Sequence, residues 1–311
     1  MTLDPQAAAL LLMLEQNPPP AIWEIPLDVA RANVIPVPGP PQPVENVESR
    51  IVSGPQGDIP VRIYTPPADA GNSPSPVGVT LFFHGGGWVT GNLDTHDALA
   101  RRLCVESRSL LVAVDYGLAP ERKFPVPVEE AAVVARWAVD EYHLPIAVTG
   151  DSAGANIAAA LCLLLRDTDG PDVAAQALLY PATEYAFETD SYRQNLGAAM
   201  LSRESMQWFW GQYLATPEDG KNPLASPLLA PSLAGLPPAQ IVIAEHDVLR
   251  DDGLHYANRL EEFGVPVERL YCPGMIHGFL RRLNVFDHAT PVLQSVGSFL
   301  NRSLSRSALR S

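Results

Sequence analysis

Short apolar segments alternate with helical segments along most of this chain, and this alternation restricts the fold more than any other feature. Six apolar runs are nearly continuous, as strands are when helices cover both faces of a parallel sheet. They span residues 77–83, 110–115, 146–149, 174–180, 240–244 and 267–271. Helical segments are expected at 94–107, 126–141, 153–166, 253–263 and 291–302. The alternation predicts a doubly wound α/β fold.

A two-stranded hairpin is expected before the first buried strand. Residues 47–52 and 59–64 each alternate apolar and polar side chains, and a Gly-Pro-Gln-Gly turn lies between them. Such alternation is typical of strands with one face in water. With this antiparallel start, the predicted sheet has eight strands and is mostly parallel.

The first 45 residues precede this pattern. Asp4 and Pro5 predict the start of a helix over 4–16, because an aspartate N-cap and a proline in the first turn both favour helix initiation. Nine prolines between residues 18 and 43 exclude a central strand, and 27–32 is a further helical candidate. We expect a segment that wraps on the surface of the domain.

A second segment, 183–216, interrupts the alternation. It carries an aromatic cluster on a predicted helix, which we interpret either as core packing or as a lid or pocket wall. The cluster comprises Met206, Trp208, Phe209, Trp210 and Tyr213. Helical spacing places the two tryptophans on different faces, so both cannot line one pocket.

Composition excludes several classes of protein. The chain has 47% hydrophobic residues and a net charge of −14, and so acidic a surface repels nucleic acid and anionic membranes. Cys104, Cys162 and Cys272 lack metal-ligand spacing and are expected to be buried thiols in a reducing compartment. The start has no basic signal region, and no apolar run reaches about 20 residues. We therefore expect a soluble cytoplasmic protein with no stable membrane association.

Ser152 is the strongest candidate for a catalytic residue. It lies in a Gly-Asp-Ser-Ala-Gly sequence between the strand predicted at 146–149 and the helix predicted at 153–166. A serine on so tight a turn is held in strained backbone geometry, which glycine neighbours permit. This strand–turn–helix context indicates a nucleophile elbow.

A nucleophilic serine needs a base and a group that orients that base. His277 lies in a short loop after the last predicted strand, and Asp247 follows the strand before it. Loops at the carboxyl ends of parallel strands come together, so this carboxylate can hold the imidazole and compensate its charge. Asp251 or Asp252 is expected to cap the next helix. The order Ser152, Asp247, His277 is that of the α/β-hydrolases.

Three consecutive glycines, Gly85, Gly86 and Gly87, follow the first buried strand. Their main-chain N–H groups can approach a substrate without side chains in the way and stabilise the negative charge of a tetrahedral intermediate. The N–H of Ala153, next after the serine, is a further donor. No metal-binding or nucleotide-binding motif accompanies them, so we expect neither a metal nor a cofactor.

In combination, these motifs make the chain similar to the hormone-sensitive lipase-like family of bacterial carboxylesterases. The resemblance covers nearly the whole chain, from the hairpin to the last helix. Further matching residues are His84, Trp88, Gly91, Thr95-His96-Asp97, Asp115-Tyr116, Leu118-Ala119-Pro120-Glu121, Phe124-Pro125, Leu249-Arg250-Asp251 and Gly278-Phe279. The sequence differs from the usual family pattern at Gly117, where an arginine is common, and at Ala155 and Val248. None of these three is a predicted catalytic group.

The resemblance implies a role for each candidate residue. The triad would be Ser152, Asp247 and His277. The oxyanion hole would be Gly86, Gly87 and Ala153, with Gly85 shaping the turn. Trp88 and the aromatic cluster would line the substrate pocket. The family also builds a helical cap, here from residues 1–45 and 183–216, over a core made of 46–182 and 217–311.

These observations predict a serine carboxylesterase that hydrolyses short- to medium-chain acyl esters through an acyl-enzyme. Its partner is then a small-molecule ester. An amidase or deacetylase with the same triad is an alternative. A non-catalytic small-molecule receptor is a third, but a receptor has no need of the base His277. Pairing of two copies through the strand near 267–271 would give a homodimer.

Overall fold

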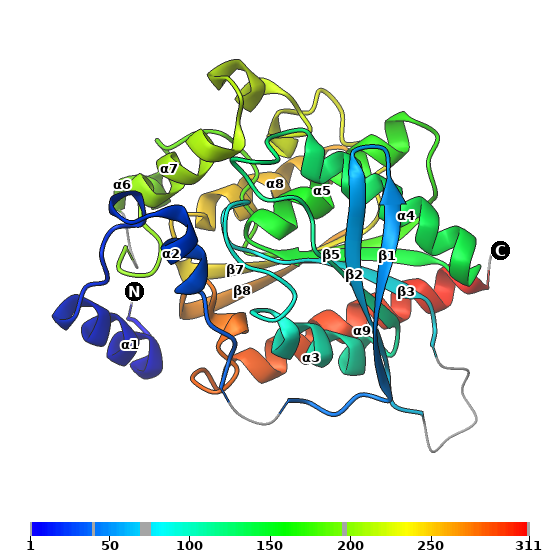
Figure 1. Cartoon of the computed structure of the whole chain (residues 1–311), viewed down its shortest axis with the longest axis horizontal. Coiled ribbons are helices and arrows are strands. Elements are labelled where there is room, and N and C mark those ends of the chain that lie inside the picture. The colour runs from blue at the N-terminus through cyan, green and yellow to red at the C-terminus, as the bar shows by residue number, and fades with distance from the viewer. Residues whose placement is uncertain (1, 39–40, 69–75, 195–197, 310–311) are drawn as a thin grey trace.

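Eight strands form one sheet in the computed structural model, which describes residues 2–38, 41–68, 76–194 and 198–309 (Figure 1). In the order β1-β2-β4-β3-β5-β6-β7-β8, β2 is antiparallel to both of its neighbours and the other pairs are parallel. The strands are β1 (Asn46–Gly54), β2 (Gly57–Thr65), β3 (Val79–Phe83), β4 (Leu110–Val114), β5 (Ile146–Asp151), β6 (Val173–Leu179), β7 (Ala239–His246) and β8 (Val267–Ile276). The predicted α/β-hydrolase fold with an antiparallel start is confirmed.

Helices cover both faces of this sheet. In Figure 1, α3 and α9 lie below the sheet, and α4, α5 and α8 lie above it. Their bounds are α3 (Asp97–Ser107), α4 (Val126–Tyr142), α5 (Ala153–Asp167), α8 (Arg250–Glu262) and α9 (Ala289–Ala308). Each layer packs its own apolar cluster against the sheet, so β3 and β5 are buried throughout. This double cover explains why their sequences are apolar without alternation.

Two helix starts differ in how well the sequence predicts them. α1 (Pro5–Gln16) begins as expected, because the Asp4 carboxylate accepts a hydrogen bond from the N–H of Gln6. α8 begins earlier than expected, at Arg250, so Asp251 and Asp252 lie inside its first turn. The prediction that one of them caps this helix is wrong. Their carboxylates instead accept hydrogen bonds from the segment that follows β6.

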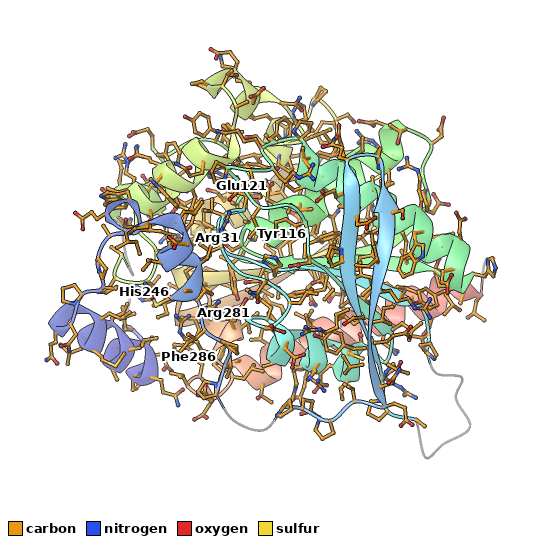
Figure 2. The ribbon with its side chains drawn as sticks, in the orientation of Figure 1. Arg31, Tyr116, Glu121, His246, Arg281 and Phe286 are labelled. Carbon is orange, nitrogen blue, oxygen red and sulfur yellow. The ribbon has the colours of Figure 1, made fainter. Side chains whose placement is uncertain are left out.

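The N-terminal segment contains α1, η1 (Ile22–Glu24) and α2 (Leu27–Ala32), and Arg31 fastens it to the core. The Arg31 guanidinium donates to the carbonyl oxygens of Val89 and Ala119 and makes two hydrogen bonds to Glu121, at 2.9 and 2.7 Å. Figure 2 shows Arg31 beside Glu121. This contact anchors the loop in which Gly117 stands in place of the family's usual arginine.

The segment 183–216 forms α6 (Asp190–Gln194) and α7 (Arg203–Tyr213), and α7 packs against η1. It therefore meets the N-terminal segment on one side of the molecule (Figure 1). Parts of both, residues 1, 39–40 and 195–197, lie outside the described residues.

β8 is an edge strand of the sheet. Its pairing with a second copy through 267–271 stays a prediction, because the edge position permits such pairing without requiring it. In the part of the chain that the structure describes, no helix is long and apolar enough to cross a membrane.

Candidate active site

Ser152 lies at the turn between β5 and α5, with φ 57° and ψ −118°. Residues other than glycine rarely adopt such a conformation, which stores strain. The surrounding turn is compact. A Cβ at Gly150 would be 2.4 Å from the main chain of Gly154, and one at Gly154 would be 2.0 Å from the carbonyl oxygen of Phe83. The close approach of β3, β5 and α5 therefore requires the glycines on either side of Ser152.

Loops at the carboxyl ends of three strands bring Ser152, Asp247 and His277 together. Nδ1 of His277 is 2.6 Å from Oδ2 of Asp247, and its Nε2 is 3.0 Å from Oγ of Ser152. The Asp247 side chain is 0% exposed and that of His277 is 13% exposed, so the carboxylate lies behind an imidazole that reaches the cavity. With a carboxylate on Nδ1–H, Nε2 can take up the proton of a hydroxyl.

The glycine loop after β3 lines the same cavity as Ser152. Gly86 and Gly87 have φ values of 119° and 61°, and a Cβ at Gly86 would be 2.2 Å from the carbonyl oxygen of Thr90. Glycine adopts such angles without strain. Among the described residues, none accepts a hydrogen bond from the N–H groups of Gly86, Gly87 or Ala153. These three donors are therefore available to a ligand beside Ser152.

A buried carboxylate, Asp151, holds this loop from behind. The N–H of Gly85 donates to its Oδ1 at 2.8 Å, and Nε2 of His96 is 3.5 Å from the same oxygen. Burial by itself would raise the pKa of Asp151, but His96, Arg281 and the Gly85 N–H outweigh it and hold that pKa below its usual value. Asp151 is therefore a charged anchor for the glycine loop.

His84, at the base of the loop, makes the stability of the fold sensitive to acid. Its buried ring stacks on Tyr116, with centroids 4.4 Å apart, and burial and then His96 lower its pKa from 6.5 to about 3. Between these pH values the unfolded chain binds a proton at residue 84 that the folded chain does not. Acidification from pH 6.5 therefore lowers the free energy of unfolding, by up to about 1.4 kcal/mol per pH unit. We expect His84→Phe to flatten this dependence, as measured by urea unfolding at a series of pH values.

The exposed His255 provides the control for this prediction. His255→Gln should keep the wild-type slope, because it replaces an exposed side chain on the surface of α8 and leaves the buried His84 unchanged. Equal slopes in the wild type and in His84→Phe would contradict a neutral, buried His84.

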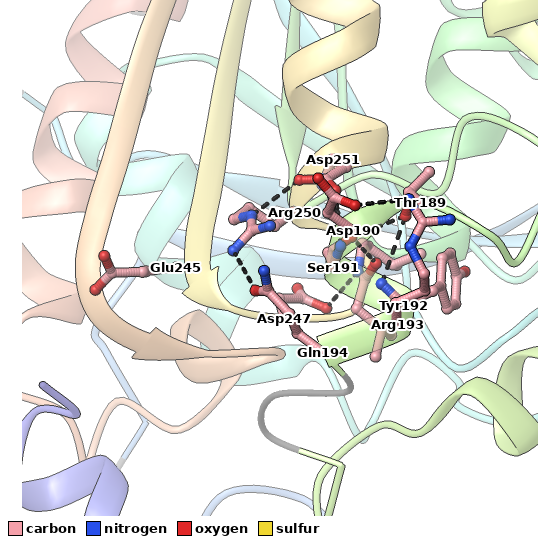
Figure 3. A network of polar contacts seen from close by, with 12 residues as sticks. Thr189, Asp190, Ser191, Tyr192, Arg193, Gln194, Glu245, Asp247, Arg250 and Asp251 are labelled. Carbon is pink, nitrogen blue, oxygen red and sulfur yellow. Dashed lines mark hydrogen bonds and ion pairs between the residues drawn. The ribbon is translucent and has the colours of Figure 1, made fainter. Parts of the chain in front are cut away.

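Asp251 belongs to a separate polar network, shown in Figure 3. Its Oδ2 accepts from the N–H of Ser191 at 2.7 Å and its Oδ1 from Nε of Arg250 at 2.9 Å. Burial would raise the pKa of Asp251, but Arg250 and Ser191 outweigh it and lower that pKa. The Ser191 hydroxyl also donates to the carbonyl oxygen of Val248 at 2.7 Å. The network ties α6 to the loop that carries Asp247, and no hydrogen bond that the structure describes joins Asp251 to His277.

A cavity of about 250 Å³ opens at Ser152 and His277. Both segments that flank the core contribute to its wall. Its larger apolar side chains are Ile22, Val34, Trp88, Met200, Leu201, Met206 and Phe209. Its charged or titratable wall residues, besides His277, are His96, Asp151, Arg281 and Arg282. The cavity is therefore apolar along part of its wall and cationic along another.

The residues predicted to line the pocket divide into two groups. Trp88, Met206 and Phe209 lie on the cavity wall, whereas Trp208, Trp210 and Tyr213 do not. Trp210 and Tyr213 are 0% exposed, and each ring centroid lies 4.4 Å from that of Trp88, so both belong to the core. The prediction that Trp208, Trp210 and Tyr213 line the substrate pocket is therefore wrong. The helical spacing of these residues shows which of them share a face of α7, but it does not show which face lies toward Ser152.

Several wall residues were not identified from the sequence. Ile22, Val34, Met200 and Leu201 lie in segments without a regular pattern, and only the folded chain brings them to Ser152. Arg281 and Arg282, in contrast, could have been identified from the sequence as wall residues. They are adjacent charges that follow closely on His277 in an otherwise largely apolar loop.

Comparisons with known proteins place the chain in a family. A family model described as the alpha/beta hydrolase fold matches residues 80–281. The carboxylic ester hydrolase LipN of Mycobacterium tuberculosis is 40% identical to this chain, over 87% of this chain and 73% of its own length. The carboxylesterase NlhH of the same organism is also 40% identical, over 82% of each chain. The crystal structure of a thermostable esterase from Pseudomonas putida matches with a TM-score of 0.89 and 32% identity, covering 97% of this chain and 98% of that one. The chain thus belongs to the hormone-sensitive lipase-like family of carboxylesterases, which have the α/β-hydrolase fold.

Proposed function

We propose that this carboxylesterase hydrolyses short- to medium-chain acyl esters with Ser152 as nucleophile, His277 as general acid–base and Asp247 as the group that orients it. One observation carries the proposal. A continuous chain of contacts runs from Asp247 through His277 to Ser152, at 2.6 and 3.0 Å, and it ends in the cavity. This chemistry requires no cofactor.

In the proposed reaction, Nε2 of His277 takes the Ser152 proton as Oγ bonds to the ester carbonyl carbon. The imidazolium then gives this proton to the alcohol oxygen, the bond between that oxygen and the carbonyl carbon breaks, and the acyl group stays on Ser152. A water molecule then gives a proton to His277 as its oxygen bonds to the acyl carbon. The bond between that carbon and Oγ breaks, His277 returns the proton to Oγ, and the acid leaves. Throughout, Asp247 keeps Nδ1 protonated and stabilises the positive charge of the ring.

The N–H groups of Gly86, Gly87 and Ala153 are proposed to bind the oxyanion of the tetrahedral intermediates. All three residues line the cavity beside Ser152, and their N–H groups have no acceptor among the described residues. One such donor is typically worth about 10²–10³-fold in kcat. In this proposal Gly85 shapes the turn, and its hydrogen bond to Asp151 holds the loop in place.

The segments 1–45 and 183–216 are proposed to form a cap over the acyl chain, on a core made of 46–182 and 217–311. Ile22 from the first segment and Phe209 from the second line the same cavity. Burial of each methylene gains about 0.8 kcal/mol until the chain reaches the wall. Activity should therefore rise with acyl length and then fall, and long-chain triglycerides should be poor substrates.

Phe209→Ala should move the preferred acyl length of p-nitrophenyl esters to longer chains. The Phe209 ring lies against Gly87, where a Cβ would be 2.2 Å away, so its removal enlarges the cavity close to Ser152. The measurement is kcat/KM across esters from acetyl to dodecanoyl. Trp208 is adjacent on α7 but does not line the cavity, and Trp208→Ala is the matched control that should keep the wild-type preference.

The same series tests the proposed function. An unchanged preference in Phe209→Ala would contradict the cap. Hydrolysis of the matching p-nitroanilide as fast as of the ester would favour the amidase alternative. No hydrolysis of any ester in the series would contradict the proposed function itself.

A further inference from the structure

Two adjacent arginines, Arg281 and Arg282, lie on the wall of the cavity beside His277 and Gly278. Arg281 ends the short helix η4 (Phe279–Arg281), and Figure 2 shows it beneath α2. Both side chains are partly buried. Within the described ranges, neither guanidinium makes a hydrogen bond or an ion pair with another residue. Two cations thus face the cavity without a hydrogen-bonded acceptor among the described residues.

Other buried or partly buried arginines of this chain show how unusual this is. Arg31 pairs with Glu121, Arg62 with Asp94 and Arg250 with Asp251. Arg259 donates to a main-chain carbonyl oxygen at 2.8 Å. A partly buried guanidinium normally finds an acceptor, because its five N–H donors lose water on burial.

The neighbouring carboxylate does not provide the missing acceptor. Asp151 accepts a hydrogen bond from the N–H of Gly85 and lies beside His96. The charge of Arg281 lowers the pKa of Asp151, but Arg281 makes no hydrogen bond to it. The two arginines also repel one another. Burial and the charge of Arg281 lower the pKa of Arg282 to about 10, so Arg282 still carries its charge at neutral pH. An anion that enters the cavity would relieve this repulsion.

We propose that Arg281 and Arg282 bind a carboxylate of the substrate, and that the substrate is an ester whose alcohol part carries this carboxylate, an O-acyl hydroxy acid. The inference rests on the proposed function and specifies its substrate class. A planar guanidinium binds a carboxylate through two parallel hydrogen bonds. The remainder of the chain is strongly acidic, with a net charge of −14, so a local cationic site is needed to admit an anionic substrate.

The position of the arginines assigns the carboxylate to the alcohol part. In the proposed reaction His277 protonates the oxygen of the leaving alcohol, so that alcohol lies against His277. Arg282 is on this side, because its Nη1 would be 3.5 Å from a Cβ at Gly278, the residue after His277. The apolar wall at Met206 and Phe209 is left for the acyl chain. Ester and water then give a carboxylic acid and a hydroxy acid, which leaves with the proton from His277.

The experiment compares two substrates of equal size, 4-acetoxybutanoate and 4-acetoxybutanamide, which differ in the charge of one end. Acetate release is measured for both. We expect the wild type to prefer the carboxylate, and Arg282→Met to lower the ratio of the two kcat/KM values by about 10- to 100-fold. Arg281→Met should act in the same direction, and Arg282→Lys, which keeps the charge but loses the planar fork, should lie between.

The control is Arg302→Met, on the half-exposed α9 arginine that pairs with Glu268, and it should keep the wild-type ratio. Thermal unfolding of each variant identifies one that fails to fold. An equal loss for both substrates in Arg282→Met would show a merely structural role and overturn the proposal, as would a wild type without preference. A preference for monoethyl glutarate over its amide, lost in Arg282→Met, would overturn the assignment to the alcohol part. Failure to hydrolyse even p-nitrophenyl acetate would instead contradict the proposed function on which this inference rests.

Discussion

Ser152→Ala should lower kcat on p-nitrophenyl esters by about 10⁴–10⁶-fold while leaving the fold intact. The change removes only Oγ, and the backbone at φ 57° is no more strained with alanine than with serine. In the proposed reaction no acyl-enzyme forms without this oxygen, and the remaining rate comes from binding and from the proposed oxyanion donors. A fluorophosphonate should label Ser152 in the wild type, which peptide mapping by mass spectrometry can locate.

The control for this prediction is Ser53→Ala, at an exposed position on β1. It should keep both the wild-type kcat and the labelling. Labelling that persists in Ser152→Ala would show that another residue is the nucleophile.

Asp247→Asn is expected to lower kcat by about 10⁴-fold. The variant should fold, because an asparagine oxygen can still accept the N–H of Leu249, which Asp247 binds through Oδ1 at 2.9 Å. An amide NH₂ facing Nδ1 of His277, however, favours the wrong tautomer of the ring and removes the charge that stabilises the imidazolium. Steady-state kinetics on one short-chain ester give the magnitude.

Asp251→Asn, in the first turn of α8 just after that loop, is the matched comparison. Asp251 binds Ser191 and Arg250, so its loss should lower the free energy of unfolding by about 1–3 kcal/mol and change kcat much less. If Asp251→Asn lost the rate and Asp247→Asn only the stability, the assignment of the two carboxylates would be reversed.

The sheet could be predicted because its physics is local. β3, β4 and β5 are short, continuous apolar runs of the kind that a sheet buries on both faces. Each strand begins and ends within a few residues of its predicted bounds. The approach of His277 to Ser152 followed from the same pattern, since the carboxyl ends of parallel strands share one edge of the sheet. Continuous apolar runs and their order along the chain were sufficient for this part.

The cavity wall could not be predicted in the same way. Trp210 and Trp208 have the same chemistry, and only the packing of α7 decides that Trp210 enters the core beside Trp88. The local sequence predicts Asp251 as a helix cap, but in the folded chain its carboxylate accepts a hydrogen bond from the N–H of Ser191. Such contacts join residues far apart in sequence, and no local pattern encodes them.

The anchoring of the N-terminal segment has a consequence for biosynthesis. Arg31 is held by acceptors between residues 89 and 121, the N–H of Asp4 donates to Gly274, and the side chain of Gln6 binds Asp287. A ribosome makes the N-terminus first, so this segment leaves the exit tunnel long before its last partners exist. The segment cannot complete its docking until the sheet has assembled. Contacts between residues so far apart in sequence close long loops, and the conformational entropy lost in closing them makes such contacts form late. The segment whose Ile22 and Val34 line the pocket therefore forms its last contacts only after translation has passed residue 287.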